Sequence, residues 1–127
     1  MRLVTDVVII GGGPGGYEAA LVAGQLRGSV TLIERRGLGG SAVLTDVVPS
    51  KTLIATAEVM TTLRGAHELG LRLDGTDDLA DAFSVDLAAV NDRVLRLAAA
   101  QSADIGARLR AEGGPGAVQR MAAAFIG

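Results

Sequence analysis

The chain has 127 residues, of which 49% are hydrophobic, and it carries a formal net charge of −2 at pH 7. This length has room for one domain, and the apolar fraction is high enough to form a core. Because acidic and basic residues are interspersed and nearly balanced, the composition argues against a nucleic-acid or anionic-membrane partner. The absence of cysteine excludes disulfides, thiolate nucleophiles and cysteine-bound metals.

Location and metal binding can be judged from the same composition. The longest aliphatic run, Val7 to Ile10, is far too short to cross a bilayer, so we expect no membrane span. A chain without cysteine fits a reducing compartment, and we expect a cytoplasmic protein. His67 is the only histidine, whereas a metal site needs several converging donors. We therefore expect no metal site and interpret His67 as a solvated side chain.

The first expected element is a strand over residues 5–11 that leads directly into glycines. Its continuous β-branched side chains are typical of a buried strand in a parallel sheet. The spacing G-x-G-x-x-G falls on Gly11, Gly13 and Gly16, just before a predicted helix. In dinucleotide-binding folds these positions provide a tight turn, a close approach to pyrophosphate and close helix packing. The candidate phosphate-binding residues are Gly11, Gly12, Gly13, Pro14, Gly15 and Gly16.

A helix from Pro14 to about Leu26, a return at Gly28 and a second strand at 30–34 complete a strand–helix–strand unit. A connection this short requires a right-handed parallel crossover, so we expect an α/β, Rossmann-like fold with parallel strands. Glu34 ends the second strand about 20 residues after the glycines, where a carboxylate binds a ribose. The helix N-terminus would offer N–H groups and the positive end of its dipole to phosphate.

After the second strand the sequence predicts a long helical excursion. Proline and glycine bound one helix, and apolar residues every three or four positions mark another. The expected elements are a glycine-rich loop at 35–41, an early helical turn or loop at 42–48, a helix from 49 or 50 to about 68, a short strand at 71–73, a polar loop at 74–84 and a long helix at 85–111. We expect Leu53, Ile54 and Met60 to lie in the core.

The segment at 39–51 resembles a known family. The residues that match its pattern G-G-T-C-x-x-x-x-C-x-P-S-K in register are Gly39, Gly40, Pro49, Ser50 and Lys51, with Ser41 in place of threonine. This pattern marks the flavin-dependent pyridine-nucleotide disulfide oxidoreductases, such as lipoamide dehydrogenase, glutathione reductase and mercuric reductase. Residues 99–105 also look like the corresponding helix of that family, so the resemblance covers about residues 5–111.

The resemblance implies that FAD is the cofactor and that NAD(P)H is the electron donor of the complete protein. By this resemblance the glycines at 11–16 hold the FAD pyrophosphate, and Glu34 accepts hydrogen bonds from the adenosine ribose. Gly40 and Ser41 would approach the pyrophosphate through backbone and hydroxyl. Arg35 is a further candidate contact, with a solvated loop charge as the alternative interpretation.

Lys51 is the candidate catalytic residue. In the family the lysine of Pro-Ser-Lys lies near flavin N5, where a positive charge would stabilise electron density on the reduced flavin. We expect Lys51 in the first turn of its helix, where a cation opposes the helix dipole at a cost of about 0.3–1 kcal/mol. Surface chance is the alternative explanation for a lysine at this position, whereas the resemblance implies a role in flavin electrostatics.

The two cysteine positions of the family pattern hold Ala42 and Val47. Because neither side chain can take electrons from a flavin, disulfide reduction by the family's route is excluded. The chain therefore most resembles the NAD(P)H:quinone reductase branch, in which reduced flavin passes electrons directly to a small acceptor such as a quinone. The apolar replacements would leave a surface beside the flavin that suits a flat hydrophobic acceptor.

The resemblance covers only part of the family's architecture. Its remaining FAD-domain strands, its NAD(P)-binding domain and its dimerisation domain find no match after residue 111. We expect residues 1–112 to form the N-terminal part of a FAD-binding domain, which is incomplete here, and residues 113–127 to be a divergent or disordered tail. The complete protein would be a homodimer, and this chain alone would bind FAD weakly and transfer no hydride.

Two other functions stay open at this point. An NAD-binding Rossmann dehydrogenase would explain the glycines and Glu34, but it would leave the match at 39–51 without a reason. A non-catalytic dinucleotide-binding module would explain the missing domains. FAD and NAD, added separately, would distinguish these alternatives, because a bound ligand stabilises the fold in proportion to its affinity.

Overall fold

The computed structural model describes residues 6–76 and 78–112 and shows two short strands with several helices. The tail expected at 113–127 lies outside the described residues, as does the start of the first expected strand. The elements are β1 (Val7–Ile10), α1 (Pro14–Gln25), β2 (Val30–Ile33), α2 (Gly40–Leu44), α3 (Val47–Gly65), the 3-10 helices η1 (Ala66–Leu69) and η2 (Leu79–Ala82), and α4 (Leu87–Glu112).

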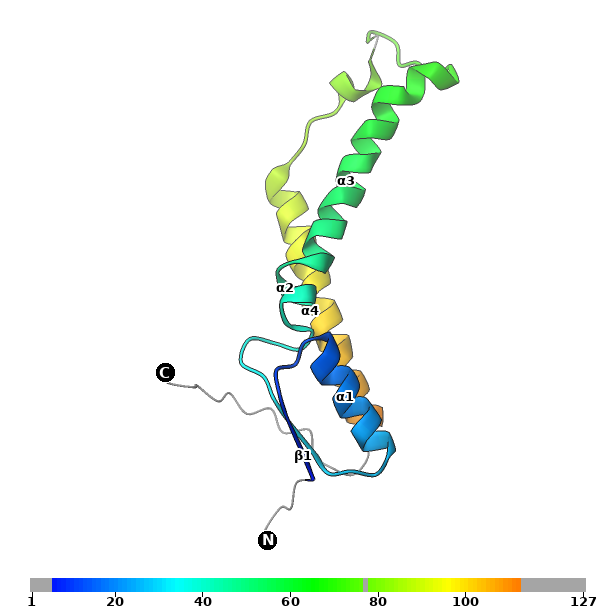
Figure 1. Cartoon of the computed structure of the whole chain (residues 1–127). Coiled ribbons are helices and arrows are strands. Elements are labelled where there is room, and N and C mark those ends of the chain that lie inside the picture. Colours follow the sequence, from blue (N-terminus) through cyan, green and yellow to red (C-terminus); the bar gives the residue numbers. More distant parts are fainter. Residues whose placement is uncertain (1–5, 77, 113–127) are drawn as a thin grey trace.

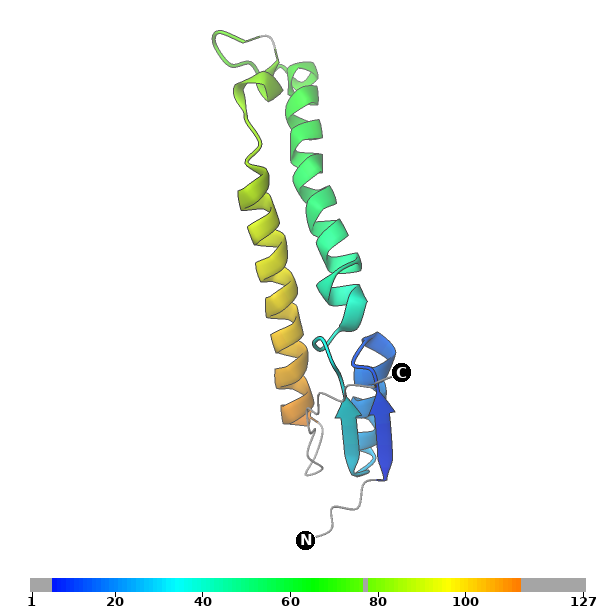
Figure 2. The same cartoon turned by 90° about the vertical axis from the view of Figure 1, so that its left-hand side faces the viewer.

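The strands β1 and β2 run parallel and are joined by α1, which confirms the predicted strand–helix–strand unit. Their register pairs Val7 with Val30 and Ile10 with Ile33. Figure 1 shows α1 beside the sheet, and Figure 2 shows α3 and α4 extending away from it side by side. The molecule is therefore elongated, with the α/β unit at one end and a helical pair at the other.

Helix α1 begins at Pro14, whose fixed φ suits the first helical position and whose missing N–H is not needed there. At the other end the chain reverses through Arg27, with a φ of +63°, and Gly28. The Gly28 N–H donates to the Ala23 carbonyl at 2.9 Å, and a Cβ on Gly28 would lie 3.0 Å from that oxygen. The predicted return at Gly28 is thus a close backbone approach.

The core lies between α1, β2 and the C-terminal part of α4. Its buried members are Ala20, Leu21, Val30, Leu32 and Leu109, with Ile9, Tyr17, Ala23, Leu38 and Ile105 packed against them. Because each buried aliphatic side chain contributes about 1.5–3 kcal/mol, this cluster holds the end of α4 against the α/β unit. The predicted apolar stripe of α4 is confirmed at Val94 and Leu109, which are buried, but Leu87 is 71% exposed.

The expectation of a buried first strand is wrong. Val8 and Ile10 of β1 are 58% and 68% exposed, whereas Ile9 between them packs against the core. In the described chain β1 pairs only with β2. A continuous apolar run indicates a strand covered on both faces, but the described residues cover only the face that carries Ile9.

Helix α3 differs from the expectation in its start and in its burial. It begins at Val47, ahead of Pro49, which the first turn tolerates because its N–H would find no partner within the helix. Leu53 and Ile54, expected in the core, are 48% and 57% exposed. Among the described residues α3 contacts mainly α2, α4 and the two 3-10 helices, so much of its apolar surface stays uncovered.

The connection between α3 and α4 contains no strand within residues 70–76 and 78–86. Leu73 makes only an isolated antiparallel bridge with Thr76. The loop that follows includes η2, whose start is capped by the Asp78 carboxylate, which accepts from the Ala80 N–H at 2.8 Å. Asp78 thus serves as a local cap within the expected polar loop.

Candidate functional site

The glycine elbow, defined here as residues 11–16, connects β1 to α1. Gly11 has a φ of +98°, a conformation that a residue with a Cβ rarely adopts. Its N–H donates to the Ile33 carbonyl at 2.8 Å, which ties the turn to the end of β2. The glycine elbow therefore lies at the carboxyl ends of both parallel strands, the edge at which ligands bind in such sheets.

The space around the glycine elbow differs from one glycine to the next. A Cβ on Gly16 would lie 1.9 Å from the Gly11 carbonyl oxygen, so α1 packs directly on the turn. Among the described residues, a Cβ built on Gly13 or Gly15 would find no atom within 4 Å apart from its chain neighbours and, for Gly15, the backbone of α1 itself. Gly16 thus has the packing role that the spacing predicts, and Gly13 borders open space.

The start of α1 has free hydrogen-bond donors. In the part of the chain that the structure describes, no side chain caps this helix. The Tyr17 N–H donates to the Gly13 carbonyl at 3.0 Å, and the N–H groups of Gly15 and Gly16, which precede it, are left for water or a ligand. Together with the positive end of the helix dipole, these donors favour an anion.

Glu34 follows β2, and its carboxylate contacts the glycine elbow. Oε2 accepts from the Gly12 N–H at 2.6 Å, and Oε1 accepts from the N–H groups of Arg36 and Gly37 at 2.6 and 3.3 Å. Partial burial alone would raise the pKa of Glu34, but these donors and the Arg35 N–H outweigh it and hold the pKa below its ordinary value. The carboxylate is therefore ionised at neutral pH.

The loop before α2 closes onto the glycine elbow from the other side. Gly39, with a φ of +94°, donates its N–H to the Gly12 carbonyl at 2.7 Å. A Cβ on Gly40 would lie 3.0 Å from the Gly13 Cα, so the two loops are in close backbone contact. The structure thus brings Gly40 to the glycine elbow. Ser41 follows in the first turn of α2 and is exposed.

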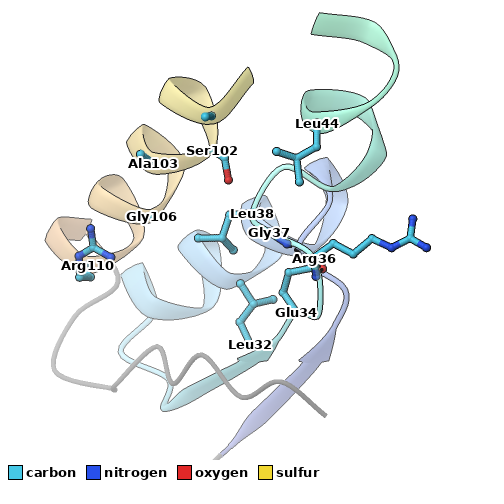
Figure 3. Close-up of a pocket in the computed structure, with 11 residues that line it drawn as sticks. Leu32, Glu34, Arg36, Gly37, Leu38, Leu44, Ser102, Ala103, Gly106 and Arg110 are labelled. Atoms are coloured by element: carbon cyan, nitrogen blue, oxygen red, sulfur yellow. Dashed lines mark hydrogen bonds between the residues drawn. The ribbon is translucent and has the colours of Figure 1, made fainter. Parts of the chain in front are cut away.

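A cavity of about 420 Å³ lies beside Glu34, between the loop after β2 and α4. Figure 3 shows Leu32, Leu38 and Leu44 on one side of it and residues of α4 on the other. Its lining residues are Leu32, Glu34, Arg36, Gly37, Leu38, Leu44, Ala99, Ser102, Ala103, Gly106 and Arg110. The cavity is mainly apolar, with charged groups at Glu34, Arg36 and Arg110.

Sequence reasoning missed the α4 wall of this cavity. A Cβ on Gly106 would lie 3.3 Å from a Leu38 methyl group, so α4 passes close to the loop after β2. Ala99, Ala103 and Gly106 recur at helical spacing on this wall. This run of small residues is the signal that could have indicated the close approach.

The side chains of Lys51 and Arg35 lie outside the hydrogen-bonded network of the glycine elbow, although the backbone N–H of Arg35 donates to Glu34. Both residues are exposed, and within residues 6–76 and 78–112 neither takes part in an ion pair. Because α3 begins at Val47, Lys51 stands in the second turn of the helix. The prediction that Lys51 opposes the helix dipole is therefore wrong, because the interaction of a charge with the dipole falls off within the first turn.

Two apolar residues occupy the positions that hold cysteine in the resembled family. Ala42 lies in α2 and Val47 opens α3, so they flank the turn between these helices. Ala42 is partly buried and Val47 is 41% exposed. Over the described residues, no three histidine, aspartate or glutamate side chains gather where they could hold a metal ion, and no helix is long and apolar enough to cross a bilayer.

A parallel β–α–β unit with a glycine elbow at its carboxyl edge defines a Rossmann-like α/β protein. Residues 5–112 match the family described as Pyridine nucleotide-disulphide oxidoreductase, and the chain belongs to this family. Flavin and NAD(P)H use is a property of the complete members of this family. The resemblance drawn from residues 39–51 is thus confirmed.

Curated relatives match over most of the chain. An NAD(P)H dehydrogenase (quinone) from Mycobacterium tuberculosis is 49% identical over 114 residues, which are 87% of this chain and 22% of that protein. A dihydrolipoyl dehydrogenase from Chlamydia trachomatis is 44% identical over 75 residues, which are 59% of this chain and 16% of that protein. The chain therefore spans about a fifth of the length of the curated relatives it matches.

Solved structures share the fold. LpdA from Mycobacterium tuberculosis superposes with a TM-score of 0.74 at 45% identity, over 92% of this chain and 24% of that one. The HOCl-induced flavoprotein disulfide reductase RclA from Escherichia coli gives a TM-score of 0.66 at 19% identity, over 94% and 22% of the two chains. The second likeness concerns the fold alone. The expected α/β, Rossmann-like fold is confirmed.

Proposed function

We propose that this chain binds FAD and forms part of a flavoprotein oxidoreductase that passes electrons from NAD(P)H through FAD to a small acceptor such as a quinone. The observation that carries the proposal is the glycine elbow, held between Glu34 and the loop before α2. The relative named NAD(P)H dehydrogenase (quinone) supports the choice of donor and acceptor.

The residues at the site fit a dinucleotide. The N–H groups of Gly15 and Gly16 suit a pyrophosphate, and the open space at Gly13 admits it. Oε2 of Glu34 accepts from the Gly12 N–H and has a second lone pair, with which it can accept from a ribose hydroxyl. Its charge disfavours a 2′-phosphate through repulsion. The proposed cofactor-binding residues are Gly11, Gly12, Gly13, Pro14, Gly15, Gly16, Glu34, Arg35, Gly40, Ser41 and Lys51.

The flavin, when bound, supplies electron transfer between the pyridine nucleotide and the acceptor. Lys51 would hold a positive charge near it, and in the described chain no ion pair neutralises that ammonium group. Ala42 and Val47 present apolar surface where the family has paired sulfurs, so the acceptor is a small apolar molecule and not a disulfide.

The complete protein is proposed to be a cytoplasmic homodimer in which residues 1–112 form the N-terminal part of the FAD-binding domain. The family's enzymes bind NAD(P)H on a separate domain with its own glycine fingerprint. We therefore expect this 127-residue chain to bind FAD weakly and to show no NADH:quinone turnover. Measured turnover by the chain alone would contradict this expectation.

Thermal unfolding of the chain with FAD and with NAD tests the proposal. A ligand that binds the folded state raises the melting temperature according to its affinity, so FAD should raise it and NAD should not. In Gly13→Val the added Cβ would lie in open space, and the backbone of Gly13 is extended, with φ −68° and ψ −178°, which valine tolerates. This variant should still fold, with a lower melting temperature of its own because valine is a poorer N-cap residue than glycine, but it should lose the FAD effect.

The other outcomes point to different functions. Stabilisation by NAD alone would favour a nicotinamide-binding dehydrogenase. No stabilisation by either nucleotide would contradict dinucleotide binding by this chain. An FAD effect that survives Gly13→Val would place the ligand away from the glycine elbow.

A further inference from the structure

The peptide groups around Gly12 are held from two sides. The Gly12 N–H donates to Glu34 Oε2 at 2.6 Å, and the Gly12 carbonyl accepts from the Gly39 N–H at 2.7 Å. Both partners are distant in sequence, and each belongs to a different loop at the same edge of the sheet. The middle of the glycine elbow is therefore fixed by the loop after β2 and by the start of α2.

Glu34 holds two loops with one carboxylate. While Oε2 binds the glycine elbow, Oε1 accepts from the Arg36 N–H at 2.6 Å and from the Gly37 N–H at 3.3 Å. No lysine or arginine side chain of the described residues forms an ion pair with Glu34. Within the described chain, backbone N–H groups are thus the hydrogen-bond partners of Glu34, and short N–H bonds to an ionised oxygen are among the stronger hydrogen bonds in proteins.

The Gly12 contact depends on the absence of a side chain. A Cβ on Gly12 would lie 3.1 Å from Glu34 Cγ and 3.0 Å from a Leu38 methyl group. Gly12 is buried, so any side chain would push Glu34 or Leu38 away. Gly12 is not one of the three glycines of the G-x-G-x-x-G spacing, and this close packing supplies a separate reason for glycine there.

We infer that Glu34 is a positioning residue for the phosphate-binding backbone, in addition to a direct contact with ribose. It fixes the peptide between Gly11 and Gly12, next to the one that Gly39 holds, and thereby helps to set the direction of the donors at the start of α1. The inference rests on the proposed function for the identity of the ligand. A preorganised site loses less free energy on binding than one that must order itself.

The two roles of Glu34 predict opposite changes in affinity, when Glu34 is removed, for a ligand that has no ribose. If Glu34 only contacts ribose, its removal leaves inorganic pyrophosphate unaffected or strengthens its binding, because a like charge is removed. If Glu34 positions the glycine elbow, its removal weakens pyrophosphate binding despite the lost repulsion. Inorganic pyrophosphate therefore separates positioning from ribose contact.

The test is a titration of the 127-residue chain with inorganic pyrophosphate, comparing the unaltered chain with Glu34→Ala. We expect the affinity to fall about tenfold or more, since a hydrogen bond to a charged group is lost. Glu58→Gln is the matched control, because Glu58 is exposed on α3 and its side chain has no hydrogen-bond or ion-pair partner among the described residues. This control should leave the affinity unchanged. Equal or tighter binding by Glu34→Ala would overturn the inference.

A second measurement needs no ligand. Hydrogen exchange of the Gly12 amide should become at least about tenfold faster in Glu34→Ala, while the amides in the middle of α3 keep their rates. If Glu34→Ala does not fold by circular dichroism, Glu34→Gln replaces it, since its amide has one acceptor oxygen for the two loops. An unchanged Gly12 rate would overturn the positioning role.

The two measurements keep the inference separate from the proposed function. A chain that binds neither FAD nor pyrophosphate contradicts the proposed function, and the Gly12 exchange rate then decides the positioning role alone. If the chain binds FAD but the exchange rate of the Gly12 amide is the same in Glu34→Ala, the proposed function stands and the positioning role of Glu34 is contradicted.

Discussion

The two ends of the molecule are built in different ways. At the α/β end, the glycine elbow is fixed by backbone hydrogen bonds and by packing so close that it leaves no room for a Cβ on Gly16. At the helical end, α3 and α4 run side by side but leave large apolar side chains such as Ile54 and Leu87 exposed. The local sequence therefore largely determines the conformation of the α/β end. At the helical end, burial of the apolar side chains depends on contacts that the local sequence does not specify.

The largest difference between the ends should appear at Gly16. A Cβ there meets the Gly11 carbonyl oxygen, so Gly16→Ala should lower the free energy of unfolding by about 3 kcal/mol, the upper end for overpacking. The matched control is Gly15→Ala in the same helical turn, where the Cβ meets nothing and stability should stay or rise slightly. Urea unfolding measures both. Equal effects would contradict the close packing.

Glu34 should give the next largest effect, and it should depend on pH. Glu34→Gln should cost about 2 kcal/mol at neutral pH, because charge-assisted hydrogen bonds to two loops are weakened. The folded-state pKa of Glu34 lies below its ordinary value of 4.5. Its contribution is therefore present above that value and is lost as the pH falls through the folded pKa.

Urea unfolding of both chains at several pH values tests this dependence. The difference between the unaltered chain and Glu34→Gln should be full at neutral pH and should shrink below pH 4.5. A difference that stays constant into the acid range would show that the charge of Glu34 contributes nothing to stability.

A smaller effect is expected at Gly70, at the helical end. Gly70 has a φ of +79° and open space around it, so Gly70→Ala should cost about 1 kcal/mol from backbone strain alone. Gly70→Asn should cost less, because asparagine tolerates this conformation. Both variants should bind FAD like the unaltered chain in a fluorescence titration. Loss of FAD binding would show that the two ends are coupled.

Lys51 should affect stability least. Lys51→Met should change the free energy of unfolding by no more than about 0.5 kcal/mol, because the residue is exposed. Without its charge, the midpoint potential of bound FAD should fall by about 20 mV, the two-electron equivalent of ~1 kcal/mol. A reductive titration measures the potential. A potential that does not move would remove Lys51 from the site.

The α/β end could be predicted from the sequence because its constraints are local. Gly11 needs a left-handed turn, Pro14 starts a helix and Gly16 sits against the turn, and all three follow one another in the chain. The parallel pairing then follows from the short crossover. The bond between Glu34 and Gly12 joins residues 22 positions apart, so it emerged only in the folded structure.

Burial could not be predicted as well, because it depends on neighbours as much as on pattern. The apolar run of β1 indicated a covered strand, yet Val8 and Ile10 are exposed. Leu53 of α3 was likewise expected in the core and is exposed. The predicted position of Lys51 within its helix was wrong for a different reason. Proline is tolerated in a first helical turn, so Pro49 does not determine where α3 begins.

The central claim is that the backbone N–H groups of Gly13, Gly15 and Gly16 bind the phosphates of FAD. The most direct measurement is a titration of glycine-labelled chain with FAD, followed through the amide resonances of its glycines. The account predicts that the amides of Gly13, Gly15 and Gly16 shift most and that those of Gly65 and Gly70 keep their positions. Shifts centred on α3 or α4, with the glycine elbow unmoved, would contradict it.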